Sequence, residues 1–315
     1  MSKISIAKQL ALNDRAQFCG SVVMNFLGFL PDKLYLSLLY RCLMGHWIDW
    51  KNPKTFSEKL QWLKLYDFKP EYTQMVDKLA VKDYVADRIG KEYIIPTLGV
   101  WDRVEDIDWD SLPNQFVLKT THGGGGGGVV ICKDKSTLDK TKAMEQLSRS
   151  MHSNAGYSLR EKPYLNVPRK IIAEKFMTPK KSPAPADLPD YKFFCFDGEP
   201  VYCQVIRDRH SNETIDFYDM EWKHMPFVGL NPVAKNGLNP VAKPLHLDTM
   251  KDICRKLSKD MRFSRIDLYV IDDKTFFGEI TLFPASGLGE FTPLEWNERL
   301  GYLIKLDGTL IRGNL

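Results

Sequence analysis

The 315-residue sequence lacks cysteines at the spacing of a metal site. Its six cysteines are scattered, with no Cys-x-x-Cys pair and no histidine cluster at ligand spacing. This pattern argues against a structural zinc site and against a disulfide framework, so we expect a reducing compartment. The cysteines are Cys19, Cys42, Cys132, Cys195, Cys203 and Cys254.

The sequence also lacks a large charge excess and any long apolar run. With 44 basic and 40 acidic residues the net charge is +4, which gives no reason to expect nucleic acid as a partner. No segment approaches the roughly 18 apolar residues of a membrane span, and the N-terminus lacks a secretory pattern. We expect a cytoplasmic protein. Residues 18–30 and 34–44 predict an apolar helical hairpin packed on the main body, with a position on a membrane surface as the alternative.

The composition is that of an ordinary globular protein, with 43% hydrophobic and 27% charged residues. Apolar periodicity predicts helices up to about residue 90, and strands in hairpins dominate from there on. The class is therefore α+β, without a series of βαβ units. A seven-residue segment, Gly229-Leu-Asn-Pro-Val-Ala-Lys235, recurs as residues 237–243, and we interpret it as a slipped insertion in a loop without assigning it a function.

A run of glycines between two apolar segments is the most informative motif. Phe116-Val-Leu-Lys119 ends in a lysine, and the glycines follow Thr-Thr-His122 and precede Val129-Val-Ile131. Side-chain-free backbone leaves N–H groups within reach of phosphate oxygens, and the lysine adds a fixed positive charge. The glycines are Gly123, Gly124, Gly125, Gly126, Gly127 and Gly128.

Two known phosphate motifs do not fit this run. In a Walker loop the lysine follows the glycines and a helix comes next, whereas here Lys119 precedes them and a second strand follows. A Rossmann fingerprint also requires a helix at the glycines. The sequence therefore predicts a strand, glycine loop, strand hairpin that covers phosphates, and the alternative is a flexible surface linker.

A second hairpin is expected to bring two carboxylates together. A turn centred on Asp273 places Asp267 opposite Glu279. The same register places Arg265 opposite Thr281, on the same face of the sheet. Opposed residues have Cβ atoms about 5 Å apart, and a set of oxygen ligands this close suits Mg²⁺. The alternative is a surface face on which Arg265 neutralises Asp267.

With these two hairpins in this order, the chain resembles the ATP-grasp ligases, including D-alanine–D-alanine ligase and biotin carboxylase, over roughly residues 75–290. It resembles the TupA-like branch more closely and over nearly its whole length. The segments that carry this closer resemblance are Asn52-Pro-Lys-Thr-Phe-Ser-Glu-Lys-Leu-Gln-Trp-Leu-Lys-Leu-Tyr66, Val76-Asp-Lys78, Asp190-Tyr-Lys-Phe-Phe-Cys-Phe-Asp-Gly198 and Asp216-Phe-Tyr-Asp219.

The resemblance implies an α+β ATP-grasp fold, in which two α+β subdomains grip ATP between antiparallel sheets. On this basis we expect an N-terminal helical region over residues 1–74. Residues 75–176 would form the small subdomain with the glycine loop. Residues 177–315 would form the C-terminal subdomain with the metal-binding hairpin.

The resemblance also implies a set of nucleotide contacts. In the family pattern the Lys78 ammonium and the glycine loop meet the phosphates. The Glu174 side chain and the Lys175 carbonyl meet the adenine amino group, and the Met177 N–H meets a ring nitrogen. Asp190 stands where the family has a glutamate that holds the ribose. The implied contacts are Lys78, Lys119, His122, the six glycines, Glu174, Lys175, Met177 and Asp190.

Metal and catalytic roles follow from the same resemblance. Two Mg²⁺ ions are implied, with Thr281 standing where the family usually has asparagine. Arg265 would stabilise the reacting oxyanion, the Gly287 N–H would face it, and Lys223 would meet the terminal phosphate. The implied metal ligands are Asp267, Glu279 and Thr281. Candidate substrate contacts are Arg207 and Arg209, whose guanidinium groups suit a carboxylate, and Asp216 and Tyr218 from the segment that resembles the ligases.

The implied reaction is ATP-dependent joining of a carboxylate to an amine through an acylphosphate. The TupA-like branch is associated with teichuronopeptide and surface-polysaccharide synthesis, which implies a uronic acid as carboxylate and an amino acid as amine. A lipid-linked acceptor would bring the protein to the inner face of a membrane. The alternatives are a glycosyltransferase of capsule or O-antigen synthesis and a non-catalytic nucleotide-binding module. Lys119 with its glycines counts against the first, and the intact Asp267 and Glu279 count against the second.

Overall fold

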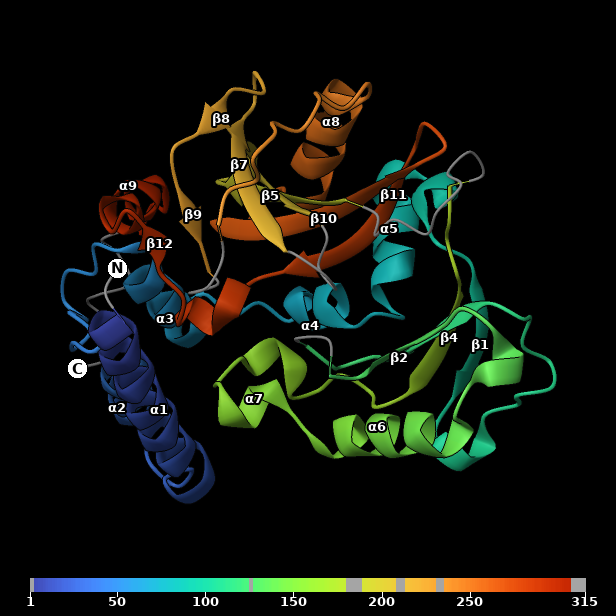
Figure 1. Ribbon diagram of the computed structural model, residues 1–315, viewed down its shortest axis with the longest axis horizontal. Coiled ribbons are helices and arrows are strands. Elements are labelled where there is room, and N and C mark those ends of the chain that lie inside the picture. The colour runs from blue at the N-terminus through green and yellow to red at the C-terminus, as the bar shows by residue number, and fades with distance from the viewer. Residues whose placement is uncertain (1–2, 125–126, 180–188, 208–212, 231–234, 307–315) are drawn as a thin grey trace.

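The computed structural model is a mixed α and β molecule whose strands form two large antiparallel sheets (Figure 1). It describes residues 3–124, 127–179, 189–207, 213–230 and 235–306, with side chains from residue 15 onward. Three of the predicted site residues, Gly125, Gly126 and Arg209, lie outside these ranges.

The N-terminal part is helical up to residue 89, as its periodicity predicts. Its helices are α1 (Lys3–Phe26), α2 (Asp32–Met44), α3 (Phe56–Tyr66), α4 (Glu71–Val76) and α5 (Val81–Ile89). Helix α3 begins at a capping box, because the Thr55 hydroxyl accepts from the Glu58 N–H and the Glu58 carboxylate accepts from the Thr55 N–H. Phe56 and Leu60 are fully buried, so α3 is part of the core.

A four-stranded sheet carries the glycine loop. Its strands are β1 (Thr97–Trp101), β2 (Phe116–Thr120), β3 (Val129–Cys132) and β4 (Ile171–Lys175), in the order β1-β4-β2-β3. Phe116 and Leu118 pack with Leu147 of α6 (Lys140–His152), which covers one face of the sheet (Figure 1). Lys119 pairs with Val129, so the glycine loop joins β2 to β3 as a hairpin, as predicted.

A six-stranded sheet carries the carboxylate hairpin. Its strands are β5 (Asp190–Phe196), β6 (Glu199–Arg207), β7 (Thr214–Asp219), β8 (His224–Met225), β10 (Phe263–Ile271) and β11 (Lys274–Thr281). The order is β11-β10-β5-β6-β7-β8, so the carboxylate hairpin lies at one edge and β8 at the other. The remaining elements are α7 (Ala155–Ser158), α8 (Leu247–Leu257), α9 (Glu295–Leu303) and the short pair β9 (Val228–Gly229) and β12 (Phe291–Thr292).

Aromatic packing joins α3 to the six-stranded sheet. The Phe56 ring lies 5.0 Å from the Phe263 ring and 5.5 Å from the Phe291 ring, in edge-to-face geometry. Phe194 of β5 packs at 5.5 Å against Phe217 of β7. Such pairs stabilise a core beyond the area they bury. The N-terminal helices are thereby fixed to the sheet that carries the carboxylates.

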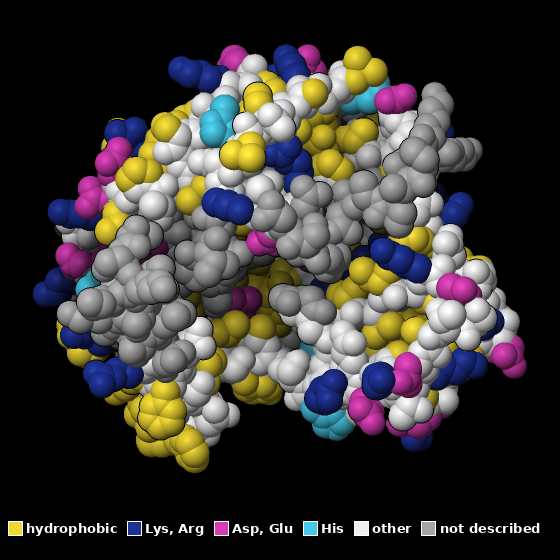
Figure 2. All heavy atoms as spheres, viewed as in Figure 1, with side chains coloured by type: hydrophobic (Ala, Val, Ile, Leu, Met, Phe, Trp, Pro, Cys, Tyr) yellow, Lys and Arg dark blue, Asp and Glu magenta, His cyan; other side chains and the backbone are white. Residues whose placement is uncertain are grey.

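The α1–α2 hairpin packs through Val23, Tyr35, Leu36 and Leu39, as the sequence predicts for a hairpin against the main body. Figure 2 shows hydrophobic side chains gathered at its free end. No helix within the described residues is long and apolar enough to cross a membrane.

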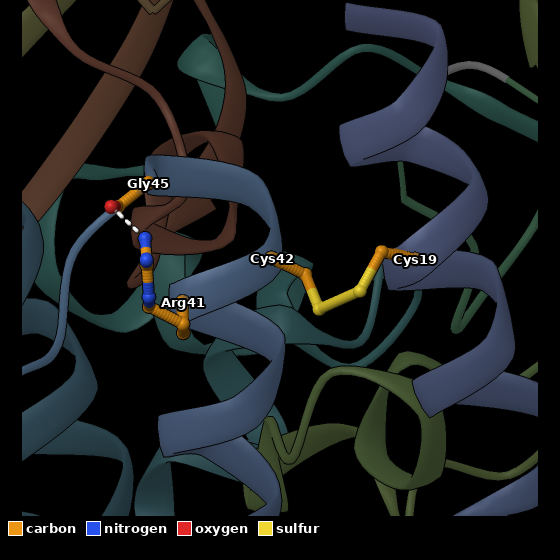
Figure 3. Close-up of a disulfide and its surroundings, with 4 residues drawn as sticks. All are labelled: Cys19, Arg41, Cys42 and Gly45. Atoms are coloured by element: carbon orange, nitrogen blue, oxygen red, sulfur yellow. Dashed lines mark hydrogen bonds between the residues drawn. A yellow bond between two sulfur atoms is a disulfide. The ribbon is translucent and has the colours of Figure 1, made fainter. Parts of the chain in front are cut away.

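The expectation that the cysteines form no disulfide is wrong for one pair. Cys19 of α1 and Cys42 of α2 form a disulfide across the hairpin (Figure 3). The spacing of the cysteines in the sequence does not predict this disulfide, because Cys19 and Cys42 are close only after α1 and α2 pack against each other. Gly45 ends α2 with a left-handed φ of 81°, and its carbonyl accepts from Arg41 (Figure 3).

Helix α9 approaches the start of α3 so closely that a glycine is required. A Cβ on Gly301 would lie 2.1 Å from the Lys54 carbonyl oxygen and 2.8 Å from the Phe56 nitrogen. We expect Gly301→Ala to lower the free energy of unfolding by roughly 1–3 kcal/mol, although alanine favours helices. Gly28→Ala is the control, because its Cβ would meet nothing within 4 Å. Equal urea midpoints for both variants would contradict this.

Candidate active site

The carboxylate hairpin has the predicted pairs. Asp267 of β10 faces Glu279 of β11, and Arg265 faces Thr281. All four side chains lie on one face of the sheet because residues two apart in a strand point the same way.

The predicted position of the turn is off by half a residue, and a bulge compensates for the error. The turn consists of Asp272 and Asp273, both with positive φ, and it places Ile271 opposite Lys274. Gly278 is then left unpaired, which shifts the register by one residue and restores the predicted pairs. A Cβ at Gly278 would lie 3.0 Å from a backbone carbonyl, so the bulge favours glycine.

Arg265 binds the whole carboxylate face. Its Nε and Nη2 donate to the two oxygens of Asp267, each at 2.7 Å, and Nη2 also lies 3.1 Å from Glu279 Oε1. The Asp267 side chain is buried, and its second cation is Lys192 of β5, which the sequence analysis did not single out. The salt-bridged alternative is therefore present in this structure.

Glu279 is the more accessible carboxylate. Its side chain keeps 43% of its accessible surface, whereas Asp267 keeps 3%. Burial opposes ionisation of Glu279, but the charges of Lys78, Lys192 and Arg265 outweigh it and lower its pKa to about 2. Glu279 is therefore ionised at neutral pH.

The donor chemistry of this face fits Mg²⁺. Two carboxylates and a hydroxyl are hard oxygen donors, and Mg²⁺ keeps several waters and shares phosphate oxygens. Among the described residues, however, no three His, Cys, Asp or Glu side chains group closely enough to hold a metal alone. A bound Mg²⁺ would need oxygens from its substrate, and two ions stay a prediction.

The four-stranded sheet contributes a second charge cluster. The buried Glu174 carboxylate lies 2.7 Å from the Lys119 ammonium and 2.6 Å from that of Lys82 in α5. Burial opposes its charge, but both lysines outweigh burial and lower its pKa. Both carboxylate oxygens are thus engaged, so an adenine amino group would compete with lysines for Glu174.

Lys78 connects the two clusters. It lies between α4 and α5, its backbone N–H donates to Thr121 at 3.0 Å, and its ammonium donates to the Gly123 carbonyl. Burial lowers the pKa of Lys78, the Glu279 charge raises it, and Lys119 lowers it. The pKa of Lys78 therefore responds to charges on both sheets, that of Glu279 and that of Lys119.

The two ends of the glycine run, Gly123 and Gly128, pack closely against the side chains of Thr120 and Ser150. A Cβ on Gly123 or Gly128 would lie 2.3 Å from the Thr120 hydroxyl, so no larger residue fits. Gly124 and Gly127 have nothing within 4 Å of a Cβ position and border open space. The end glycines are required by packing, whereas Gly124 and Gly127 have open space where a side chain would lie.

His122 does not face this space. Its buried ring lies with Nε2 3.1 Å from the carbonyl oxygens of Ser150 and Ser153, near the end of α6. Burial lowers its pKa. Its predicted contact with the nucleotide has no support in this geometry.

The other predicted nucleotide contacts follow β4 and begin β5. Lys175 ends β4, where its N–H donates to the Pro96 carbonyl, and Met177 lies two residues beyond. Asp190 is buried on the same face as Asp267, with the Lys192 ammonium 3.8 Å away.

The predicted substrate residues lie on the opposite face of the six-stranded sheet. Across the sheet, Asp267 faces Lys192, Lys192 faces Gln204, and Gln204 faces Phe217. These four side chains therefore lie on the same face as the carboxylate hairpin. Asp216 and Tyr218 flank Phe217, so they point the other way. Arg207 lies on their side, because its Nη2 donates to Asp216 at 2.8 Å.

These side chains bind the second copy of the duplicated segment. Asp216 accepts from the Gly237 N–H, Arg207 donates to the Asn239 carbonyl, and the Tyr218 hydroxyl accepts from the Val241 N–H. The prediction that they hold an anionic substrate is therefore not supported.

Lys223 also lies far from the carboxylates. It is exposed in the turn between β7 and β8, at the edge of the sheet opposite β11. Five strand spacings separate these edges, which corresponds to roughly 24 Å. Its predicted contact with the terminal phosphate has no support here.

Gly287 lies in a left-handed turn, η5 (Pro284–Gly287), just after β11. Ala285, Ser286 and Gly287 have φ values of 47°, 55° and 61°. Gln61 of α3 donates to the Ser286 and Gly287 carbonyls at 2.9 and 2.8 Å. Because the peptide unit is planar and trans, the Gly287 N–H points away from α3.

Three residues that contact this site were not predicted from the sequence: Lys192, Lys82 and Gln61. Lys192 follows Asp190 by two residues, so strand alternation would have placed it on the carboxylate face. Lys82 lies in the first turn of α5, four residues after Lys78, and no local pattern marks it as a partner of Glu174. Gln61 carries no such signal, because its partners are more than 200 residues away.

Comparisons with known proteins place these features in a family. The TupA-like ATP-grasp family matches residues 58–305. No curated protein matches the chain.

Solved structures with a similar fold have low sequence identity. A D-alanine–D-alanine ligase from Bacillus anthracis is 17% identical, with 67% of this chain and 58% of that chain covered and a TM-score of 0.39. The ATP-grasp ligase PsnB with its minimal precursor, Mg and ADP is 14% identical, with 72% and 57% covered and a TM-score of 0.38. D-alanyl-alanine synthetase A from Vibrio cholerae is 10% identical, with 76% of this chain and 63% of that chain covered and a TM-score of 0.43. This chain spans less than two thirds of the length of each.

The Glu174 cluster makes a testable contribution to stability. We expect Glu174→Gln to lower the free energy of unfolding by roughly 3 kcal/mol at pH 7, because it leaves two partly buried ammonium groups without their charge partner. The Glu174 pKa is lowered from its ordinary 4.5, so its contribution exists above that pH and is lost as the pH falls through the folded-state value.

Urea unfolding at pH 7 and at lower pH checks both statements. Glu105→Gln is the control, because its pair with Arg103 is exposed and contributes at most about 1 kcal/mol. A difference between wild type and Glu174→Gln that grows on acidification would show that the carboxylate does not stabilise through its charge.

Proposed function

Because this chain belongs to the TupA-like ATP-grasp family, we propose that it is an ATP-dependent ligase that joins a carboxylate to an amine. One observation carries the proposal beyond the family match. Lys78 lies within electrostatic range of Glu279 on the carboxylate hairpin and of Lys119 beside the glycine loop. The groups that we propose for phosphate and for metal, one on each sheet, thus both act on this ammonium. The division at residues 74 and 176 is part of this proposal.

The first proposed step forms an acylphosphate. The substrate carboxylate oxygen attacks the terminal phosphorus of ATP, the bond to the bridging oxygen breaks, and ADP leaves. Lys78 and Lys119 neutralise phosphate charge, and the glycine loop excludes water that would hydrolyse the product. Bound Mg²⁺, held by Asp267 and Glu279, would supply further charge neutralisation at the phosphate oxygens.

The second proposed step forms the amide. The amine nitrogen attacks the acyl carbon, phosphate leaves with the electron pair of the broken C–O bond, and the nitrogen loses a proton. Arg265 on this face and the Gly287 N–H in the turn after β11 are the groups that we propose for the oxyanion of the intermediate. Arg265 keeps its charge throughout, because Asp267 and Glu279 outweigh burial and raise its pKa.

The substrate assignment rests on the family branch. TupA-like proteins are associated with teichuronopeptide and surface-polysaccharide synthesis, which supports a uronic acid carboxylate and an amino acid as the pair. The proposed substrate site does not include Arg207, Asp216 and Tyr218, because they lie on the opposite face of the sheet from the carboxylates.

A peripheral contact with a membrane is the second part of the proposal. Phe26 and Phe29, at the turn that joins α1 to α2, are 72% and 80% exposed, and Phe18, earlier on α1, is 71% exposed. Lys33 is exposed near the start of α2, and the acid before it, Asp32, is paired with Arg160 at 3.1 Å. An exposed aromatic end with a basic margin suits an anionic lipid surface. If the acceptor substrate is linked to a lipid, this membrane contact would bring the protein to it.

The ligase proposal predicts ADP release that depends on both a uronic acid and an amino acid. Screening pairs of these while following phosphate identifies the substrates. We expect Lys119→Met to lower kcat/KM by about 10²–10³-fold, because it removes one positioned charge at the phosphates. Lys133→Met, an exposed lysine just after β3, is the control and should be unchanged. Nucleoside diphosphate released from a nucleotide sugar, with no ATP turnover, would favour the glycosyltransferase alternative.

The membrane proposal predicts co-sedimentation with vesicles that contain phosphatidylglycerol. The double variant Phe26→Ser, Phe29→Ser should lose most of this binding, because it removes the apolar end. Leu238→Ser removes an equally exposed apolar side chain elsewhere and is the control. Binding that persists in the double variant, or a dimer that the double variant disrupts, would refute a lipid contact at this surface.

A further inference from the structure

Helix α3 presents three buried polar side chains to the segment that contains Gly287. Ser57, Gln61 and Lys64 lie at the spacing of successive helical turns, and each is at most 1% exposed. Ser57 donates to the Gly289 carbonyl at 2.8 Å, and Gln61 donates to the Ser286 and Gly287 carbonyls. Buried polar groups on a core helix are costly unless they are paired, and each of these three side chains has a partner in residues 286–289.

Lys64 makes the most extensive of these contacts. Its ammonium donates to the Ser286 carbonyl at 2.8 Å, to the Ser286 hydroxyl at 2.7 Å and to the Leu159 carbonyl at 3.0 Å. These three acceptors match the three donors of an ammonium group. One buried charge therefore ties together α3, the turn after β11 and the segment that leads into β4.

The turn needs this support. Ala285 and Ser286 are non-glycine residues in the left-handed region, which costs about 1–2 kcal/mol for each residue. Such a conformation persists only when its surroundings impose it. Within the turn, the described hydrogen bonds run from Ser286 to Phe283 and from Leu288 to Ala285.

The segment on the other side of Lys64 also reaches the carboxylate face. Glu161 is buried, and its charge acts on Lys64, whose ammonium donates to the Ser286 hydroxyl. Tyr164, at the end of η4 (Lys162–Tyr164), has its pKa raised by burial and by the charges of Glu161 and Glu279. The cluster of Lys64, Glu161 and Tyr164 is thus continuous with the hairpin that carries Glu279.

We propose that Lys64 is a positioning residue that holds the left-handed turn so that the Gly287 N–H faces the reacting carboxylate, and that it couples this turn to the segment leading into β4. This inference rests on the proposed ligase function for its effect on turnover. It does not depend on that function for its effect on the turn.

The coupling has a pH dependence. Burial lowers the pKa of Lys64 to about 8, and the facing Glu161 raises it in part. Tyr164 is the other titratable group of the cluster, and burial raises its pKa well above the range concerned. The ammonium loses its proton as the pH rises through about 8, and the turn should loosen there.

Hydrogen exchange of the Ser286 and Leu288 amides tests the proposal without any substrate. We expect Lys64→Met to speed their exchange by at least about tenfold at pH 7. Lys59→Met is the matched control, because Lys59 lies on the same helix and donates to the Ile304 carbonyl at 2.7 Å, away from the turn. Exchange at the turn that is equal in the two variants would overturn the proposal.

A second variant tests the charge. Glu161→Gln removes the group that raises the Lys64 pKa, so the pH at which exchange accelerates should move downward. An unchanged midpoint would show that Lys64 does not titrate in holding the turn.

Turnover separates this inference from the ligase proposal. In an active enzyme, Lys64→Met should lower kcat by about 10–100-fold and change the KM for ATP by less than about threefold. If wild type shows no ligase activity with any substrate pair, the proposed function fails while the exchange result still decides the role of Lys64. If kcat is unchanged although the turn loosens, the positioning role is refuted.

Discussion

Asp267 is a buried carboxylate, and the cost of burying its charge shapes the strands around it. A single carboxylate of this kind is strongly destabilising unless cations and hydrogen bonds compensate for it. Arg265 lies two residues before it on the same strand, and Lys192 lies opposite on the neighbouring strand. The pairing of Asp267 with Lys192 supports the register of β5 and β10. Arg265 extends it to β11, because its Nη2 also contacts Glu279 and Thr281.

Local patterns could be predicted from the sequence because their partners are close along the chain. The β10–β11 pairing and the β2–β3 glycine hairpin each depend on one turn. The register was right even though the turn was placed half a residue away, because Gly278 forms a bulge. A glycine inside a strand is the signal that would have located it.

Contacts between distant segments could not be predicted in this way. Asp216 and Tyr218 were assigned to the site by resemblance, but the face they occupy depends on the pairing of β5, β6, β7 and β10. The disulfide between Cys19 and Cys42 likewise depends on how two helices pack. Alternation along one strand gives two faces, and only the neighbouring strands decide which of them meets the carboxylates.

The charges of the site suggest how it changes when a nucleotide binds. Five cations (Lys78, Lys82, Lys119, Lys192 and Arg265) meet four carboxylates (Glu174, Asp190, Asp267 and Glu279), which leaves one positive charge in excess. Lys119 and Lys192 are paired with carboxylates on their own sheets, and Lys82 of α5 is paired with Glu174. The Lys78 ammonium donates to the Gly123 carbonyl. A triphosphate with its metal is an anion of about two charges and would compete for these same ammonium groups. Lys119 must then share Glu174 with a phosphate, whereas Lys82 can keep Glu174 in place from α5. The second lysine on Glu174 thus allows the first to change partner without leaving a buried carboxylate unpaired.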